Sequence, residues 1–366
     1  MNSYVKKDEL YMRIAIGLGA RGKGSTFPNP PVGAILVKDS RIIGKGWHRY
    51  RGEPHAEINA IEDARSNKNN TEGATLYVTL EPCCHYGTTP PCTEAILKAG
   101  ITRVVVSCRD DFDERVCGMG IAILREEGIS VDEGVLADEG MELIDHYRVQ
   151  RTERRAFLTL KWAQSIDGMI ATATGHSQWI SGAKALKFGH ILRTHHGSVA
   201  VGANTVTMDN PHLNIRSVES HHKPARIILV GGRELASSLN VFSNDSTRVL
   251  VIRDGEYVGD EILPEFVETL FVPRGKFFWK NLLTSLYERG VGSVLLEGGG
   301  KVITSALKAK AADKIFIAIA PIFIGAGISA IGDIGTKDLN EALKLGKVKY
   351  RNLDDDIIIS GYSKRD

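Results

Sequence analysis

The chain has 366 residues, of which 43% are hydrophobic and 25% charged, with 46 Lys and Arg against 44 Asp and Glu. This length allows two domains with sizeable cores, and the composition is typical of a globular protein. The net charge of +2 is spread without a basic stripe, which argues against nucleic acid or an anionic membrane as a partner. The longest apolar run, residues 315–325, covers about half a membrane span and contains Pro321, so it predicts a buried strand and turn.

The N-terminus and the cysteines predict a cytoplasmic protein. Residues 1–18 lack the long apolar core and the small-residue cleavage site of an export signal. All cysteines lie in one short stretch, whereas a disulfide framework would spread pairs through the chain. They are Cys83, Cys84, Cys92, Cys108 and Cys117. Clustering beside a histidine favours a metal site in a reducing compartment. The oligomeric state is left open, with a homo-oligomer among the options.

Helical and strand patterns alternate along the chain on both sides of a polar, basic stretch at 140–156. In the first half, the periodicities predict helices at 8–22, 55–65, 91–100 and 118–128, and strands within 30–48, 74–80, 102–108 and 129–136. In the second half they predict strands at 156–168, 198–206, 225–232, 248–254, 293–300, 314–321 and 354–363. We therefore predict two α/β domains, residues 1–150 and 151–366, with sheets covered by helices.

Metal-ligand residue types stand at the starts of two predicted helices. His55 and Glu57 open one helix, and although residues two apart point to opposite sides deeper in a helix, both can flank a point above its first turn. Cys83 follows a strand, and Cys92 opens the next helix, where the helix N-terminus favours a thiolate. One His and two Cys leave a fourth tetrahedral position open, as in catalytic zinc sites. His-x-Glu followed by Pro-Cys and a second Cys is the signature of zinc-dependent nucleobase deaminases, in which the Glu moves protons.

Other interpretations of these residues stay open. A His-x-Glu triplet often occurs by chance. A structural zinc with four ligands would also use Cys84, which would close the site and leave Glu57 without a role, although adjacent cysteines seldom fit one tetrahedral site. We interpret Cys108 as a core strand residue and Cys117 as a small loop residue.

The segments PNPPVGAILV, HAEINAI and EPCCHYGTTPPC, in this order and spacing, resemble the deaminase domain of the bifunctional riboflavin-biosynthesis deaminase–reductase family. The resemblance covers nearly the whole chain and implies an N-terminal cytidine-deaminase-like α/β/α sandwich. It also implies roles for single residues. The zinc ligands would be His55, Cys83 and Cys92, the proton shuttle Glu57, and the substrate-side residues Asn29 and His85.

This sequence departs from the family pattern at two places that border the substrate pocket in the family. Thr88 stands where Arg or Lys is usual, and RDDFDE at 109–114 stands where Asp-Pro-Asn-Pro is usual. Cys84 occupies a position where the family commonly has a small residue such as Ser, so we interpret it as a bystander. These departures leave the substrate of the deaminase less certain than its zinc chemistry.

The second half carries one motif of its own, LLEGGGKVITSALKA. It predicts a strand, a glycine turn and a helix whose first N–H groups can hold a phosphate, but such turns are often only tight connections. No G-x-G-x-x-G follows a first strand, so the usual dinucleotide fingerprint is absent.

Three segments of the second half, LKWAQSIDGMIATATGHSQWIS, VGANTVTMDNPHLNIR and LEGGGKVITSAL, are similar to the reductase domain of the same family. The resemblance implies a dihydrofolate-reductase-like α/β fold and NADPH as cofactor. Matching substrate positions are Lys161, Ser177, Arg193, Leu213, Arg216 and Glu297. Matching cofactor positions are Ala163, Trp179, Thr205, Asp209, Gly299, Gly300, Lys301, Val302, Ile303, Thr304 and Ser305.

Simpler interpretations exist for some of these positions. Each arginine alone could be a solvated surface residue, and Glu297 could cap the helix after it. Val230 and Gly231 stand where the family usually has Asp and Ser, which puts one cofactor contact in doubt.

The resemblance implies a function in two steps. A diaminopyrimidinone ribosylamino phosphate would be deaminated by hydrolysis, and its ribosyl group would then be reduced to ribityl with NADPH. One alternative keeps the two folds but changes the pyrimidine or amine substrate, or leaves only one domain active. Another is a non-enzymatic nucleotide-binding or scaffold protein with structural zinc. Ammonia release from the pyrimidine separates these alternatives.

Overall fold

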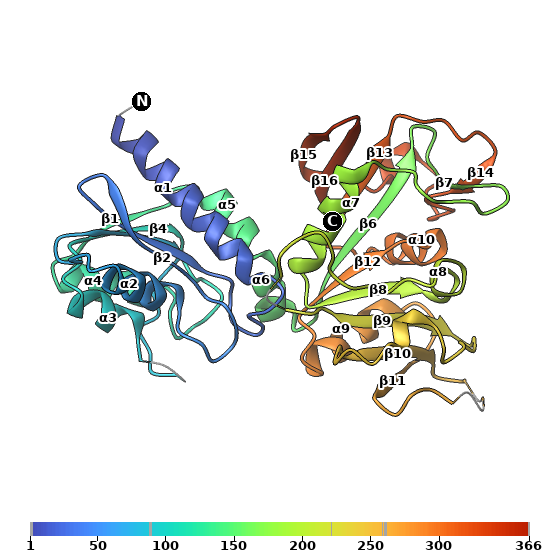
Figure 1. The fold of residues 1–366 in the computed structure, drawn as a ribbon, viewed down its shortest axis with the longest axis horizontal. Helices are drawn as coiled ribbons and strands as arrows, with labels where there is room; N and C mark the ends of the chain where they lie inside the picture. Colours follow the sequence, from blue (N-terminus) through green and yellow to red (C-terminus); the bar gives the residue numbers. More distant parts are fainter. Residues whose placement is uncertain (1–2, 88–89, 221, 258, 260–261, 365–366) are drawn as a thin grey trace. The chain divides into compact units, whose positions relative to one another are not determined.

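The computed structural model describes residues 3–87, 90–220, 222–257, 259 and 262–364 (Figure 1). The chain divides into two compact units, Met1–Arg154 and Arg155–Asp366, which we call unit 1 and unit 2. Each unit is a sheet packed with helices, which confirms the predicted pair of α/β folds. The basic stretch before the second unit is itself structured: it forms α6 (Asp145–Glu153), and Tyr147 and Val149 of this helix are buried.

Unit 1 is built on one five-stranded sheet with the order β2-β1-β3-β4-β5. Its strands are β1 (Gly33–Lys38), β2 (Arg41–Trp47), β3 (Thr75–Leu80), β4 (Arg103–Cys108) and β5 (Ser130–Glu133). The helices besides α6 are α1 (Ser3–Gly19), α2 (Ala56–Ser66), α3 (Cys92–Lys98), α4 (Met119–Glu126) and α5 (Ala137–Leu143). β1 is antiparallel to β2 and β3, whereas β3, β4 and β5 run parallel.

Both faces of this sheet are covered. Ala34 and Leu36 of β1 pack with α2, α3 and α4 in one core, while Ile35 and Val37 pack with α1 in the other (Figure 1). Successive strand residues point to opposite faces, so burial on both faces explains why β1, β3 and β4 are almost continuously apolar.

A glycine sets the approach of α2 to the sheet. A Cβ atom on Gly46 of β2 would lie 2.2 Å from the carbonyl oxygen of Ala56, the first residue of α2. Any side chain here would therefore push the start of the helix away from β2. The N-terminus of α2, which carries His55 and Glu57, is held against the sheet by this close contact.

Unit 2 is built on a nine-stranded sheet with the order β11-β10-β9-β8-β12-β6-β13-β16-β15. Its strands are β6 (Phe157–Ser165), β8 (Ser198–Gly202), β9 (Ala225–Gly231), β10 (Val249–Asp254), β11 (Val267–Val272), β12 (Ser293–Glu297), β13 (Lys314–Ala320), β15 (Leu345–Leu353) and β16 (Asp356–Ser363). All neighbouring strands pair in parallel except β16, which is antiparallel to both of its neighbours, β13 and β15. A separate two-stranded sheet joins β7 (Met169–Thr172) and β14 (Gly327–Ser329).

The helices of unit 2 cover the parallel strands on both faces. They are α7 (Ala183–Thr194), α8 (Ala203–Asp209), α9 (Phe278–Glu288) and α10 (Gly300–Lys308). α9 and α10 pack in one core, and α8 and α7 in cores of the opposite face. From β8 the chain moves outward through β9, β10 and β11, then returns at β12 on the other side of β8. The loops after β8 and β12 therefore lie at a topological switch point, where open α/β sheets bind ligands.

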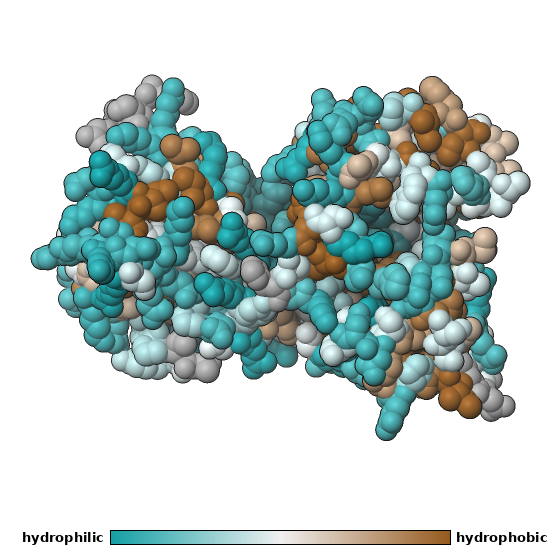
Figure 2. Space-filling model, in the orientation of Figure 1, coloured by the Kyte–Doolittle hydropathy of each residue, from teal (hydrophilic) through white to brown (hydrophobic). Residues whose placement is uncertain are grey.

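The drawn face is largely hydrophilic, with hydrophobic patches on both units, one of them over the part of unit 2 that carries β7 and β14 (Figure 2). Phe323 and Ile328 in this region are 75% and 46% exposed. Among the helices of the described residues, none has the length and apolar character needed to cross a membrane.

Candidate functional site

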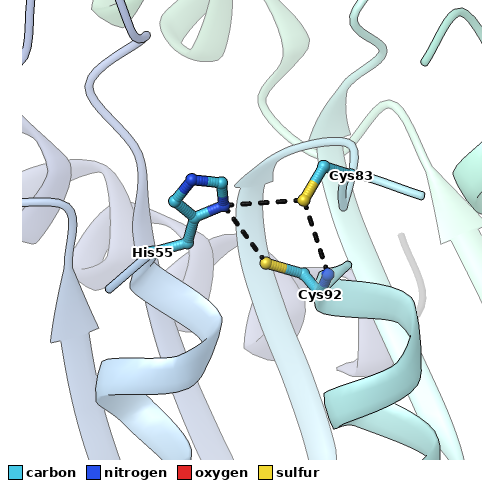
Figure 3. Close-up of side chains that lie close together, drawn as sticks. All are labelled: His55, Cys83 and Cys92. Atoms are coloured by element: carbon cyan, nitrogen blue, oxygen red, sulfur yellow. Dashed lines mark hydrogen bonds between the residues drawn. The ribbon is translucent and has the colours of Figure 1, made fainter. Parts of the chain in front are cut away.

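Three side chains with metal-ligand atoms converge in unit 1 (Figure 3). His55 is the N-cap residue of α2, Cys92 is the first residue of α3, and Cys83 lies in the loop after β3. The Nδ1 atom of His55 lies 3.5 Å from Cys83 Sγ and 3.3 Å from Cys92 Sγ. The ligand atoms of all three residues lie within 4.8 Å of one another. Two helix starts and one strand end thus place these atoms around one point.

The spacing of these atoms fits a zinc ion. With Zn–N near 2.0–2.1 Å and Zn–S near 2.3 Å, tetrahedral geometry puts nitrogen and sulfur ligands about 3.6 Å apart, close to the observed 3.3 and 3.5 Å. Cys84 is not part of this group in the described chain, and its Sγ lies 3.4 Å from the carbonyl oxygen of Arg115. The donor set of one His and two Cys therefore fits zinc with an open fourth position.

Glu57 is the second residue of α2 and is only 3% exposed. Burial raises the pKa of its carboxyl to about 7, with smaller effects from His55, Cys83 and Cys92. A carboxyl group in this range can both accept and donate a proton near neutral pH. Glu57 is not one of the three converging ligands, so it is available for proton transfer beside them.

A second histidine, His48, which the sequence analysis did not identify, lies directly beside the group. Its ring contacts the His55 ring edge-on, with centroids 5.3 Å apart. Its Nδ1 lies 3.2 Å from the carbonyl oxygen of Pro54 and its Nε2 lies 3.1 Å from Asn29 Nδ2. Burial lowers the pKa of His48 to about 4. The neutral ring therefore donates from Nδ1 and accepts from the Asn29 amide, which fixes how Asn29 presents its oxygen.

A cavity of about 240 Å³ is lined by Asn29, His48, His55, Glu57 and Cys83. His85 also lines it, and its Nδ1 is a buried atom without a hydrogen-bond partner in the described part of the chain. Because an unsatisfied buried polar atom costs about 1–3 kcal/mol, a ligand that supplies the partner would bind favourably here. A larger hollow of about 760 Å³ beside Trp47 is lined by none of the three metal-type ligands.

The segment at 109–114, which departs from the family pattern, also reaches this cavity. Asp110 and Asp113 line it. Burial raises the pKa of Asp110 to about 6, and the Tyr147 hydroxyl donates to its Oδ2 at 3.1 Å. Thr88, the other departure, lies outside the described residues.

A buried charged cluster joins β6, α7 and β12 in unit 2. Arg193 donates from Nε and Nη2 to the Glu297 carboxylate at 2.8 and 2.7 Å, and from Nη1 to the carbonyl oxygen of Asn214 at 2.6 Å. Lys161 is paired in register with Glu297 across the two strands. The interpretations of Arg193 as a solvated residue and of Glu297 as a helix cap are therefore wrong. The sequence analysis missed His190, whose Nδ1 accepts from the Arg216 backbone N–H at 3.1 Å.

The glycine turn after β12 reaches the loop after β8 at the switch point. Gly298 and Gly299 have φ of 72° and 75°, a conformation that favours glycine. A Cβ atom on Gly299 would lie 3.4 Å from Thr205 Oγ1. The N–H groups of Val302 and Ile303 already donate to the Gly299 carbonyl oxygen, whereas those of Gly300 and Lys301 precede the first intrahelical bond, and such groups can bind an anion.

The other cofactor positions differ in how well they fit a ligand contact. Ile303 is fully buried in the core, and Ser305 Oγ accepts from Trp279 Nε1 at 3.0 Å. The side chains of Ile303 and Ser305 thus face the protein, and the backbone at the start of α10 is the accessible part. Val230 is 4% exposed in the core, and Gly231 has φ of 60°, so neither offers a polar side chain to a cofactor.

The remaining predicted positions are spread over the strands and loops of unit 2. Ala163 lies in β6, Thr205 and Asp209 in α8, and Gly300 to Thr304 in α10. Leu213 is 3% exposed and Trp179 is 70% exposed. Ser177 lies in the loop between β7 and α7 and is half-buried, and Arg216 is exposed. The interactions described for these side chains do not join them into one cluster with Glu297.

Comparisons with known proteins cover both units. Residues 5–108 match the cytidine and deoxycytidylate deaminase zinc-binding region, and residues 156–359 match the RibD C-terminal domain. The chain is 43% identical to riboflavin biosynthesis protein RibD of Aquifex aeolicus, over 96% of this chain and 97% of that protein. It is 32% identical to RibD of Escherichia coli, over 96% of this chain and 98% of that protein.

A solved structure supports the same relationship. The diaminohydroxyphosphoribosylaminopyrimidine deaminase/5-amino-6-(5-phosphoribosylamino)uracil reductase of Thermotoga maritima superimposes with a TM-score of 0.84 at 38% identity, over 99% of this chain and 100% of that chain. Acinetobacter baumannii RibD gives a TM-score of 0.81 at 32% identity, over 99% of this chain and 100% of that chain. The chain therefore belongs to the RibD family of riboflavin-biosynthesis proteins, as a bifunctional enzyme that joins a zinc-dependent deaminase to an NADPH-dependent reductase.

Proposed function

We propose that the enzyme acts on the compounds named for its Thermotoga maritima relative. It deaminates diaminohydroxyphosphoribosylaminopyrimidine by hydrolysis and then reduces the ribosyl group of 5-amino-6-(5-phosphoribosylamino)uracil to ribityl. Unit 1, Met1–Arg154, carries the first step, and unit 2, Arg155–Asp366, carries the second. The observation that carries the first step is one cavity lined by His55, Cys83, Glu57 and the Asn29 amide, with Cys92 converging on the same two ligands. Five free cysteines fit a cytoplasmic location.

In the deaminase, His55, Cys83 and Cys92 hold the zinc ion. When bound, zinc supplies the Lewis acidity that makes water nucleophilic near neutral pH. Glu57 accepts a proton from the attacking water and passes it to the departing amino group, which leaves as ammonia. Its buried position beside Cys92 supports this role.

Asn29 and His85 orient the pyrimidine in the cavity. His48 holds the Asn29 amide through one hydrogen bond, so the amide oxygen and its second N–H remain for the ring. His85 offers an imidazole nitrogen that has no partner in the described chain. We therefore assign His48 a positioning role and the other two direct contact with substrate.

In the reductase, NADPH supplies the hydride and the protein supplies orientation. Lys161, Ser177, Leu213, Arg216 and Glu297 contact the phosphorylated substrate. Arg193 acts by holding the Glu297 carboxylate, because three of its five N–H donors already bind Glu297 and Asn214. The cofactor lies along the positions Ala163, Trp179, Thr205, Asp209, Gly299, Gly300, Lys301, Val302, Ile303, Thr304 and Ser305, with the backbone at the start of α10 on its phosphates.

The experiment that tests the proposal supplies each step with its own substrate. Zinc-loaded wild-type enzyme should release ammonia from the diaminopyrimidine and oxidise NADPH with the aminouracil. Glu57→Gln should keep zinc and lose about 10²–10⁴ in the rate of ammonia release, with NADPH oxidation on the aminouracil retained. Arg216→Ala should show the reverse pattern. No ammonia from the wild-type enzyme, or loss of both activities in a folded Glu57→Gln protein, contradicts the two-site proposal.

A further inference from the structure

Two arginines line the deaminase cavity, and no lysine does among the described residues around it. Arg115 follows the segment at 109–114, and Arg151 lies in α6. They come from parts of unit 1 that are distant in the sequence but reach the same cavity as His55 and Glu57. A negatively charged group of a ligand in this cavity would meet these two guanidinium groups.

One buried carboxylate orients both arginines. Asp113, whose side chain is 8% exposed, accepts from Arg115 Nε at 2.9 Å and from Arg115 Nη2 at 2.6 Å. Arg151 Nη2 lies 3.4 Å from the same carboxylate, and Arg151 Nε donates to the carbonyl oxygen of Phe112 at 3.3 Å. A guanidinium has five N–H donors, so these bonds fix the planes of both groups and leave donors for a ligand.

Asp113 and the two guanidinium groups together carry one net positive charge. Four other carboxyl groups line the cavity, those of Glu53, Glu57, Glu81 and Asp110. Asp110 accepts a hydrogen bond from the Tyr147 hydroxyl. The neighbouring Glu81 is occupied by the backbone, because its carboxylate accepts from the N–H groups of Gly118, Ile121 and Asp110. Asp113 thus holds two arginines at the cavity, and their side chains, 61% exposed for Arg115 and 38% for Arg151, remain accessible to a ligand.

We propose that Arg115 and Arg151 bind the phosphate of the deaminase substrate. Guanidinium groups bind phosphate oxygens through paired, charge-assisted hydrogen bonds, and Asp113 presets their geometry. The inference rests on the proposed function, since it assigns the phosphate of that substrate to one place in the cavity. It makes Arg115 and Arg151 specificity residues that favour the phosphorylated pyrimidine over its dephosphorylated form.

The test measures kcat/KM for ammonia release from the phosphorylated pyrimidine and from the same compound after removal of its phosphate. The ratio of the two values should be well above one for zinc-loaded wild-type enzyme. Arg115→Ala and Arg151→Ala should each lower this ratio about ten- to hundredfold, mainly through KM, as expected for loss of a charge-assisted hydrogen bond. The lysine variants Arg115→Lys and Arg151→Lys should retain part of the ratio, which separates charge from a folding defect.

Arg109→Ala is the matched control, because Arg109 belongs to the same segment and is paired with Asp111 at 3.5 Å, but does not line the cavity. It should leave the ratio unchanged. A wild-type ratio near one, an unchanged ratio in both alanine variants, or an equal fall in the control would overturn the subsite while leaving the proposed deamination standing. Failure of the wild-type enzyme to release ammonia from either compound would overturn both.

Discussion

Arg193→Met should destabilise unit 2, because it removes the partner of a buried carboxylate. Arg193 and Glu297 form a two-bond ion pair whose side chains are only 13% and 14% exposed. Methionine keeps an apolar stem of similar length but no charge. Glu297 would then have Lys161 as its remaining neighbouring cation.

The size of the effect follows from the pKa of Glu297. Burial raises that pKa, but the charge and hydrogen bonds of Arg193, with a smaller contribution from Lys161, lower it from 4.5 to about 2. This drop corresponds to about 3 kcal/mol, and breaking a buried pair by removing one partner costs about 3–5 kcal/mol. Because Lys161 still neutralises part of the charge, we expect the free energy of unfolding to fall by about 2–3 kcal/mol at neutral pH.

The effect should depend on pH in a defined direction. A carboxyl whose folded-state pKa is lowered adds stability above its unfolded pKa, near 4.5, and this stability is lost as the pH falls toward about 2. The difference between wild type and Arg193→Met should therefore shrink as the pH falls through this window.

Urea unfolding monitored by tryptophan fluorescence measures the change. A Trp47→Phe background removes the tryptophan of unit 1, so that the buried Trp162 and Trp279 report on unit 2. Arg248→Met is the matched control, because its two-bond pair with Glu268 is 36% and 49% exposed and should contribute at most about 1 kcal/mol. A loss below about 1 kcal/mol for Arg193→Met, or equal losses in both variants, would refute this reasoning.

Three further predictions concern the metal site, the cavity and the glycine turn. Cys92→Ser should lose zinc whereas Cys84→Ser should keep one zinc per chain, measured by metal analysis; an empty site in Cys84→Ser would instead show a fourth protein ligand. Burial raises the pKa of Asp110 from 3.8 to about 6, so the folded state holds a proton that the unfolded state has lost. Wild-type stability should then fall by up to about 3 kcal/mol as the pH rises through this range, and Asp110→Asn should not show this fall in urea unfolding; equal pH profiles would contradict the burial argument. Gly299→Ala should cost about 1 kcal/mol because of its φ of 75° and should weaken NADPH binding in a fluorescence titration, and unchanged affinity would exclude this turn from the cofactor site.

Local patterns in the sequence were sufficient for much of the fold. Strands such as β3, β4 and β13 are apolar runs of six or seven residues, a length typical of a buried strand. The starts of α2 and α3 are marked by the prolines that precede them. The antiparallel edge strand β15 was not predicted, because residues 345–353 are mostly exposed and carry Lys and Arg without an apolar face. Edge strands are often protected by such charges, which hides them from a search based on hydrophobic periodicity.

Some residues of the site could be identified from the sequence, and others only from the structure. His55, Glu57 and Cys92 could be identified from the sequence because each stands at a helix start, a position that short-range signals mark. The role of His48 depends on Asn29 and Pro54 lying against its ring, and the partner of Glu297 is Arg193, which is 104 positions away in the chain. Such residues are brought together by the order of strands in the sheets and by the packing of helices on them. The hydrophobic periodicity of a single segment reveals neither of these. The sequence by itself thus determined most of the elements and the metal-ligand chemistry, whereas tertiary structure decided which charges are buried together and which remain for a ligand.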